Sequence, residues 1–228
     1  MYYSIILSMV SSTTPEDSTT KDKLKCNLWL AFNDAKILLE PSEANIQALA
    51  LLATHVEEFT SPSLCYMLIA TASRMLHALG VTSRNLSPET RQRRIMTFWY
   101  LNLVDKGLSI IFGRPPTFHR AMTRTIPMPT VLQLLPFEPH NKAPRQGQGA
   151  RPGSLFGAHY VHQVMSLSYV IGDVWTCIHD SIPLDQRAIE FTRNSLEVWY
   201  ASAKTVRCEN ISRSKRRTHE LTFTHIDD

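Results

Sequence analysis

The sequence is poor in cysteine and glycine, and each shortage excludes a class of protein. Only four cysteines occur among 228 residues, and no two lie closer than 31 residues: Cys26, Cys65, Cys177 and Cys208. This spacing gives neither a CxxC pair nor a disulfide framework, so we expect a reducing compartment and no metal site. With 8 glycines and 13 prolines, the chain is neither collagen-like nor largely disordered.

Long apolar runs and a strong charge of one sign are also missing. The apolar stretch over residues 2–10 is too short to cross a bilayer and has no basic residue before it, unlike a signal peptide. The net charge of +4 is mild, and the lysines and arginines are spread along the chain. We therefore expect no membrane contact, and charge alone does not predict a nucleic-acid site.

Sequence motifs of catalysis are absent as well. None of GxxxxGK[ST], GxGxxG, HExxH or GxSxG occurs. His159 and His162 stand three residues apart on a predicted helix, but the sequence offers no third and fourth ligand beside them. No serine or cysteine stands in a recognisable pattern with a histidine and an acid. We predict no catalytic residue, no bound metal and no enzymatic activity.

What the sequence does contain is helical periodicity. Apolar residues recur every three or four positions, and serine caps, first-turn prolines and stop glycines separate these runs. We expect helices over residues 24–39, 42–59, 61–79, 87–112, 155–178 and 184–206. Residues 114–137 are proline-rich and lack a clear period, which favours a mostly irregular crossing segment. The predicted fold class is all-α, a multi-helix antiparallel bundle-like domain with this Pro-rich crossing segment.

Composition also indicates where the domain begins and ends. Residues 11–23 are polar and turn-rich, and residues 1–23 as a whole are predicted to be a disordered lead-in. One helical domain is expected over residues 24–206, with a flexible linker at about 138–153. Residues 207–228 are polar and mixed in charge and are predicted to be a disordered tail.

The predicted tail contains a run of basic residues. Its members are Arg213, Lys215, Arg216 and Arg217. Such a run is typical of a nuclear-import patch, and a solvated tail is the alternative interpretation.

The helix expected over residues 87–112 carries unusual charges. Arg91, Arg93 and Arg94 stand in its first turns, where cations oppose the helix dipole. They either contact an acidic partner or phosphates, or they form a solvated face with ion pairs to Glu89 or the preceding loop.

Asp105 falls inside the same apolar helix and needs a partner, because an unpaired buried charge is very costly. Arg114 is the nearest cation suited to a carboxylate. We predict an Asp105–Arg114 pair that clamps the helix to the crossing segment, with a ligand-contacting role for Asp105 as the alternative.

Residues 93–118, RRIMTFWYLNLVDKGLSIIFGRPPTF, resemble the signature of the fungal-specific transcription factor domain. This domain is the regulatory middle region of fungal zinc-cluster transcription factors. The residues that carry the resemblance are Arg93, Arg94, Phe98, Trp99, Asp105, Lys106, Gly113, Arg114, Pro115 and Pro116. Residues 42–58 and 63–81 are similar to the preceding helices of the family, and residues 155–175 match later helices more weakly. The resemblance implies an all-α domain of a nuclear protein that regulates transcription.

In that family a separate module, in which six cysteines hold two zinc ions, reads the DNA. The four scattered cysteines do not form it, so we expect no cofactor in this chain, and zinc only in a longer product that carries the cysteine cluster. DNA contact is then indirect or made through that module. The resemblance implies as partners other transcription-factor chains or regulatory proteins, and a small-molecule effector.

Three other interpretations remain open at this point. The chain could be a truncated paralogue that dimerises with or titrates a full-length factor, or an incomplete gene product without an independent role. It could also be a helical ligand sensor with a pocket between helices. Candidate lining residues for that pocket are Met67, Met75, Phe98 and Trp99, although ordinary core packing explains the same spacing.

Overall fold

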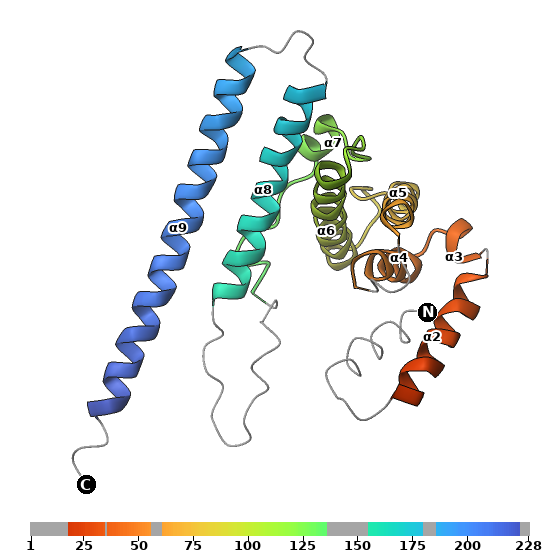
Figure 1. Ribbon diagram of the computed structural model, residues 1–228, viewed down its shortest axis with the longest axis horizontal. Coiled ribbons are helices and arrows are strands. Elements are labelled where there is room, and N and C mark those ends of the chain that lie inside the picture. Colours follow the sequence, from red (N-terminus) through yellow and green to blue (C-terminus); the bar gives the residue numbers. More distant parts are fainter. Residues whose placement is uncertain (1–17, 35, 56–60, 136–154, 180–185, 224–228) are drawn as a thin grey trace. The chain divides into compact units, whose positions relative to one another are not determined.

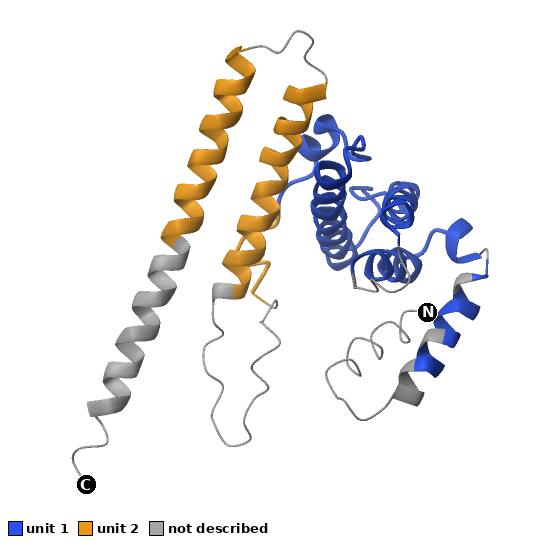
Figure 2. Cartoon of the chain, in the orientation of Figure 1, with its two compact units in different colours: residues 1–128 blue, residues 129–228 orange. Residues whose placement is uncertain are grey.

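The protein is built from helices that form two compact units (Figure 1, Figure 2). The computed structural model describes residues 18–34, 36–55, 61–135, 155–179 and 186–223. Within those ranges every regular secondary-structure element is a helix, which confirms the predicted all-α class. Unit 1 comprises residues 1–128 and unit 2 comprises residues 129–228.

Three helices of unit 1 pack together. The helices of this unit are α2 (Ser18–Phe32), α3 (Lys36–Leu39), α4 (Glu43–His55), α5 (Pro62–Leu79), α6 (Pro88–Phe112) and α7 (Arg120–Thr125). Helix α5 packs on both α4 and α6, and α4 also contacts α6. The three therefore enclose one core.

Local sequence signals fix the ends of α5 and α6. The Oγ of Ser61 accepts a hydrogen bond from the amide of Leu64 at 3.3 Å, and Ser87 caps α6 in the same way. Each serine is followed by a proline in the first turn. Gly80 (φ 77°) and Gly113 (φ 62°) end the two helices in backbone conformations that favour glycine. The sequence predicted all of these boundaries.

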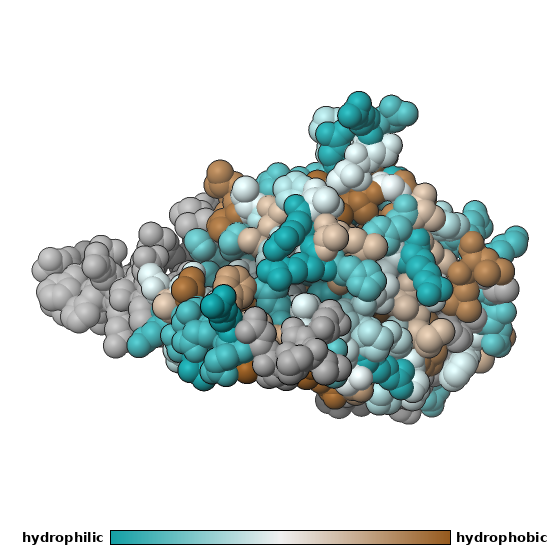
Figure 3. Space-filling view, turned by 90° about the horizontal axis from the view of Figure 1, so that it is seen from above, coloured by the Kyte–Doolittle hydropathy of each residue, from teal (hydrophilic) through white to brown (hydrophobic). Residues whose placement is uncertain are grey.

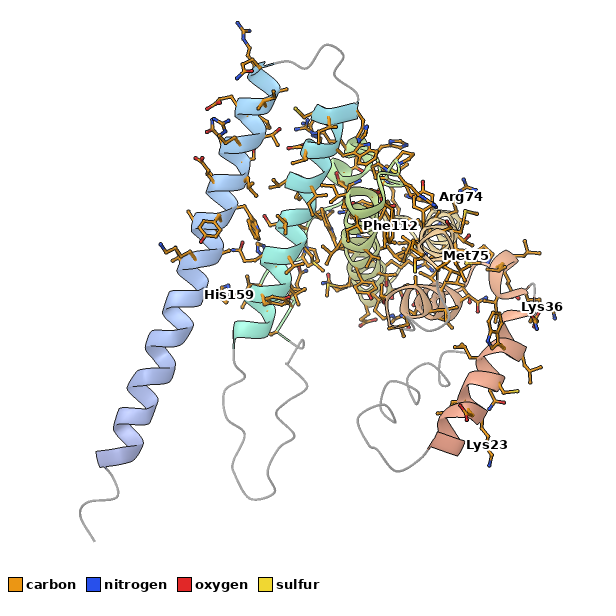
Figure 4. All side chains as sticks on the ribbon, in the orientation of Figure 1. Lys23, Lys36, Arg74, Met75, Phe112 and His159 are labelled. Atoms are coloured by element: carbon orange, nitrogen blue, oxygen red, sulfur yellow. The ribbon has the colours of Figure 1, made fainter. Side chains whose placement is uncertain are left out.

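The core of unit 1 is made mainly by the apolar faces of α4, α5 and α6. The large apolar side chains that these helices bury fully include Ile46 and Leu49 from α4, Leu68, Ile69 and Leu76 from α5, and Phe98, Trp99 and Leu101 from α6. Burying a side chain of this size contributes about 1.5–3 kcal/mol. Figure 4 shows the contrast at two neighbouring positions of α5: Arg74 is exposed, whereas Met75 is buried.

Helix α6 is long and apolar enough, by length and composition alone, to cross a membrane. Its burial gives a different explanation. Phe98 and Trp99 are fully buried in unit 1. The two charged residues Asp105 and Lys106 are only 1% and 4% exposed, and other groups of the protein surround them. Helix α6 is therefore the central core helix of unit 1.

The segment after α6 crosses unit 1 and is mostly irregular, as predicted. The exception is α7, a helix of 6 residues that interrupts the expected irregular region. Phe118 and Ile126 flank α7 and are both buried, so the segment is anchored by apolar side chains at two points. Their burial results from tertiary packing, so the spacing of apolar residues along the sequence did not predict it.

Unit 2 contains an antiparallel pair of helices, α8 (Leu155–His179) and α9 (Gln186–Phe223) (Figure 1). Trp199 donates a hydrogen bond from Nε1 to the carbonyl oxygen of Gln163 at 2.8 Å, and the Gln163 amide donates to the Ser202 Oγ at 2.8 Å. These contacts join α9 to α8 where the two helices run side by side.

Two helices extend into segments that were predicted to be irregular. Helix α2 begins at Ser18, inside the predicted lead-in over residues 1–23, and α9 continues to Phe223, inside the predicted tail. Residues 186–223 contain neither glycine nor proline, so no local signal stops α9 earlier. The predicted linker over residues 138–153 lies outside the described residues.

Candidate functional site

Asp105 is the centre of the site formed by the signature residues. It lies on α6 and is 1% exposed. Its Oδ1 accepts a hydrogen bond from the amide of Thr117 at 2.9 Å, and its Oδ2 accepts one from the amide of Phe118 at 3.1 Å. Both carboxylate oxygens thus bind backbone amides of the crossing segment, and such charge-assisted bonds are stronger than neutral ones.

Lys106, the next residue on α6, binds the same segment. It is 4% exposed, and its Nζ donates a hydrogen bond to the carbonyl oxygen of Phe118. The Nζ also lies 3.8 Å from Oδ2 of Asp105. Burial lowers the pKa of Lys106, and the nearby Asp105 charge raises it, with burial the larger cause. The two charges therefore bind the amide and the carbonyl of a single residue, Phe118.

Phe118 inserts its ring into the core of unit 1. The side chain is fully buried. Its ring centroid lies 4.9 Å from that of Phe98 in an edge-on arrangement and 5.6 Å from that of His77. Edge-to-face aromatic pairs at this separation are favourable. The crossing segment is thus held by polar bonds to its backbone and by apolar packing of its side chain at the same point.

His77 is exposed on α5 and only partly removed from water, so we expect it to give unit 1 a small pH dependence. Burial lowers the pKa of His77 from 6.5, so the unfolded chain binds the proton more readily than the folded chain. Stability is therefore expected to fall as the pH drops through about 6.5 toward the lower folded pKa. Urea unfolding at about pH 7 and pH 5 should show this loss, and His77→Gln should reduce it. An equal loss in the variant would contradict the assignment to His77.

Trp99 anchors the far end of the crossing segment. Its side chain is fully buried, and its Nε1 donates a hydrogen bond to the carbonyl oxygen of Pro127 at 2.9 Å. The ring also packs edge-on against Phe98, with the centroids 5.6 Å apart. The Phe-Trp pair of the signature therefore serves both to fill the core and to bind the segment.

Arg114 and its neighbours bind the start of the crossing segment to α5. Arg114 donates a hydrogen bond from Nη2 to the Ser63 Oγ at 2.7 Å, and its guanidinium lies 5.3 Å from the centroid of the Tyr66 ring. The Tyr66 hydroxyl donates to the carbonyl oxygen of Pro115 at 2.8 Å. Pro116 is half-buried next to them. The Gly-Arg-Pro-Pro motif is thus a junction between α6 and α5.

The predicted Asp105–Arg114 pair is wrong, although Asp105 does fix α6 to the crossing segment. Asp105 binds the amides of Thr117 and Phe118, and Arg114 turns to Ser63 on α5. Two backbone amides bind the carboxylate, and the buried cation beside it is the neighbouring Lys106, 3.8 Å away.

The arginines at the start of α6 bind a carboxylate of another helix. Arg94 lies 3.1 Å from Oε1 of Glu43 through its Nε and also donates to the carbonyl oxygens of Leu79 and, at 2.9 Å, Gly80. Arg93 lies 3.4 Å from Oε2 of Glu43. The partner is therefore Glu43 on α4, and the predicted ion pair with Glu89 is not found among the described side chains.

Burial distinguishes these two arginines. The Arg94 side chain is 13% exposed and joins α4, α5 and α6, whereas the Arg93 side chain is 60% exposed. We expect Arg94→Ala to lower the free energy of unfolding by about 2–3 kcal/mol, because partly buried carbonyls and a carboxylate lose a charged donor. Arg93→Ala is the matched control and should cost no more than about 1 kcal/mol. Urea unfolding measures both, and equal losses would contradict the assigned roles.

Sequence reasoning missed the partners supplied by α4 and α5. Glu43, Ser63 and Tyr66 lie 51, 51 and 49 positions along the chain from the signature residues that they contact. No local pattern marks them. An acidic first turn in α4 was the only signal, and it has an equally good explanation in the helix dipole.

The structure does not bring together the four residues suggested for a ligand pocket. Phe98, Trp99 and Met75 are buried in the core of unit 1. Met67, by contrast, is 59% exposed on α5. Plain core packing explains the first three residues, and the fourth points away from them.

The remaining sequence candidates take no part in this site. His159 and His162 are half-buried on α8, and burial, followed by the charge of His159, lowers the pKa of His162. Over the ranges that the structure covers, no three or more His, Cys, Asp or Glu side chains gather as metal ligands. The basic run over residues 213–217 lies on α9 where side chains are not described. The described surface mixes hydrophilic and hydrophobic residues (Figure 3).

The arrangement above is a helical domain whose signature residues hold a crossing segment to a three-helix core. The sequence pattern of the family described as "Fungal specific transcription factor domain" matches residues 2–201. This chain belongs to that family.

Curated relatives carry names of the same kind. A transcriptional regulator of Claviceps purpurea is 41% identical over 208 residues, which is 90% of this chain and 32% of that protein. An uncharacterized transcriptional regulatory protein of Schizosaccharomyces pombe is 29% identical over 122 residues, which is 52% of this chain and 19% of that protein. An ABC-transporter-regulating transcription factor of Aspergillus fumigatus is 28% identical over 120 residues, 48% of this chain and 13% of that protein.

This chain thus spans about a third or less of the length of these relatives. No solved structure matches it.

Proposed function

We propose that this chain regulates transcription as the regulatory middle domain of a fungal zinc-cluster-type transcription factor acting in the nucleus. The observation that supports this most is the family match over residues 2–201. The charged signature residues Asp105, Lys106 and Arg114 bind groups of unit 1 itself. Regulation then runs through the outer surface of the domain, by contact with regulatory proteins or other transcription-factor chains, or through a small-molecule effector. DNA is reached through a zinc-binding module elsewhere.

A tethering assay tests this proposal. The chain is fused to an unrelated DNA-binding domain and directed to a reporter promoter in a fungal cell. Reporter output should rise or fall relative to the DNA-binding domain alone, and Asp105→Asn should remove the effect because it loosens the crossing segment. An unchanged reporter at equal protein level would refute a regulatory role for this chain.

The basic run of the C-terminal part is proposed to direct nuclear import. In a fluorescent fusion, alanine at all four positions, Arg213, Lys215, Arg216 and Arg217, is expected to abolish nuclear accumulation. The control carries four alanines at exposed cations elsewhere: Lys23, Lys36, Arg74 and Arg124. Because both variants lose the same charge, nuclear accumulation that is equal in the two would contradict the proposal.

A second candidate function is dimerisation with, or titration of, a full-length relative. Large apolar side chains on α9 favour it: Phe191, Val198 and Tyr200 are 56%, 71% and 64% exposed. Phe191 and Val198 are seven positions apart and share a helix face. Molar mass in solution, alone and with a relative, tests this, and Phe191→Asp with Val198→Asp should abolish any association.

A further inference from the structure

An arginine cluster surrounds the turn between α5 and α6. It consists of Arg84 in the turn and Arg91, Arg93 and Arg94 in the first turns of α6. Arg91 donates from Nη2 to the carbonyl oxygen of Ser83 at 3.5 Å, which places its guanidinium beside the turn. Arg94 reaches the end of α5 just before the same turn, through the carbonyl oxygen of Gly80 at 2.9 Å. Arg91 and Arg94 thus contact the backbone just before Arg84, and Arg93 stands between them in sequence on the first turns of α6.

The members of the arginine cluster differ in how many contacts they make within unit 1 and in how exposed they are. Arg94 is committed to internal contacts, and Arg93 shares the carboxylate of Glu43 while remaining 60% exposed. Arg84 and Arg91 are exposed and make no ion pair with any described residue. Glu43 and the exposed Glu89 supply the opposing charges nearby. Two guanidinium groups thus face solvent without a carboxylate, and a third is only partly satisfied.

Glu43 reveals which chemistry this surface accommodates. One of its oxygens lies 3.1 Å from Nε of Arg94, and the other lies 3.4 Å from Nε of Arg93. The surface already binds a carboxylate through two neighbouring arginines. The planar fork of arginine suits carboxylates, and exposed arginines are enriched where proteins meet partners.

We propose that the arginine cluster is a docking surface for an acidic segment of a partner protein, with Arg84, Arg91 and Arg93 binding its side-chain carboxylates. The proposal rests on the proposed function, for which it names the surface and the chemistry of the protein partner. Spaced glutamate or aspartate residues would meet the exposed guanidinium groups of Arg84, Arg91 and Arg93, and the internally bound Arg94 would keep the turn in place. Positive N-terminal ends of α4 and α6 add to the attraction.

A nucleic-acid partner fits this region less well. A protein that binds a DNA backbone firmly makes several phosphate contacts, on the order of 6–10. The arginine cluster offers three available cations, and Glu43 and Glu89 stand among them and would repel a continuous row of phosphates. Discrete carboxylates can be placed between these acids, whereas the regular phosphates of a duplex cannot.

Fluorescence anisotropy with the whole chain tests the proposal. The probe is a labelled short peptide of alternating glutamate and serine, compared with its glutamine counterpart and with a short duplex DNA of random sequence. The cluster variant carries Arg84→Glu and Arg91→Glu. The control variant carries Lys23→Glu and Arg124→Glu, which are exposed on α2 and α7 and change the net charge equally.

The parent chain should bind the acidic peptide and not its glutamine counterpart. The cluster variant should weaken that binding about tenfold, and the control variant should change it by no more than about twofold, at low and at physiological salt. Circular dichroism shows that both variants keep the helical fold. Equal weakening in the two variants would mean that only net charge matters and would overturn the proposal.

Two further results would also overturn it: no binding of the acidic peptide at low salt, or tighter binding of the duplex that depends on Arg84 and Arg91. These results are independent of the tethering assay. A chain that regulates the reporter without binding the peptide would lack the docking surface and keep the proposed function. A silent reporter with cluster-dependent peptide binding would refute the function alone.

Discussion

Asp105→Asn is expected to lower the free energy of unfolding of unit 1 by about 3–5 kcal/mol, the cost of breaking a buried charge pair. The substitution leaves Lys106 buried without its counter-charge, 3.8 Å away in the parent. The new amide nitrogen is a donor, and it would face the amide of either Thr117 or Phe118, which is also a donor. One hydrogen bond becomes a clash between donors.

Urea unfolding followed by helical circular dichroism measures this loss. The matched control is Asp22→Asn on α2, an exposed position where the same chemical change should cost less than about 0.5 kcal/mol. A variant at Asp105 as stable as the control would mean that the two amide bonds do not hold the crossing segment. Lys106→Met should approach the effect of Asp105→Asn, because it leaves the carboxylate and the Phe118 carbonyl without their cation.

Phe118→Ala is expected to cost about 3–5 kcal/mol, the range for removing a large aromatic side chain from a core. The side chain is fully buried and packs on Phe98 and His77, so its removal leaves a cavity between α5 and α6. The backbone bonds from Asp105 and Lys106 remain possible, but they would no longer be shielded from water.

The control for this position is Ile111→Ala, a large apolar side chain on α6 that is 70% exposed. It should change stability by less than about 0.5 kcal/mol. Phe118→Leu should lose less than the alanine variant, because it keeps part of the buried volume. If alanine at Phe118 and at Ile111 had equal effects, the crossing segment would not depend on this anchor. In the tethering assay, loss of reporter regulation by Phe118→Ala at unchanged protein level would link this anchor to function.

The sequence was a good guide to local structure. Ser61-Pro62 and Ser87-Pro88 begin helices, and Gly80 and Gly113 end them, as their chemistry predicts. These signals work because a cap or a stop depends on hydrogen bonds within a few residues. The spacing of apolar residues also indicated the buried faces of α4, α5 and α6. The end of α9 was missed, although the lack of glycine and proline over residues 186–223 was visible.

The partners of the charged residues could not be obtained in this way. Asp105 accepts hydrogen bonds from two backbone amides 12 and 13 positions away, and Arg94 donates one to a carboxylate 51 positions away. Which groups come within 3 Å of a side chain depends on how the helices pack. The sequence supplies many chemically suitable candidates for each charge.

By itself, the sequence determined the helical class, the ends of α5 and α6 and the family, because local hydrogen bonding, periodic burial and the spaced signature can be read along the chain. The tertiary structure alone decided that Asp105 and Lys106 bind the backbone of Phe118 and that Arg114 binds Ser63. It also decided that Arg84 and Arg91 are exposed to solvent. These choices follow from packing three helices into one core, which brings distant residues together and leaves others exposed.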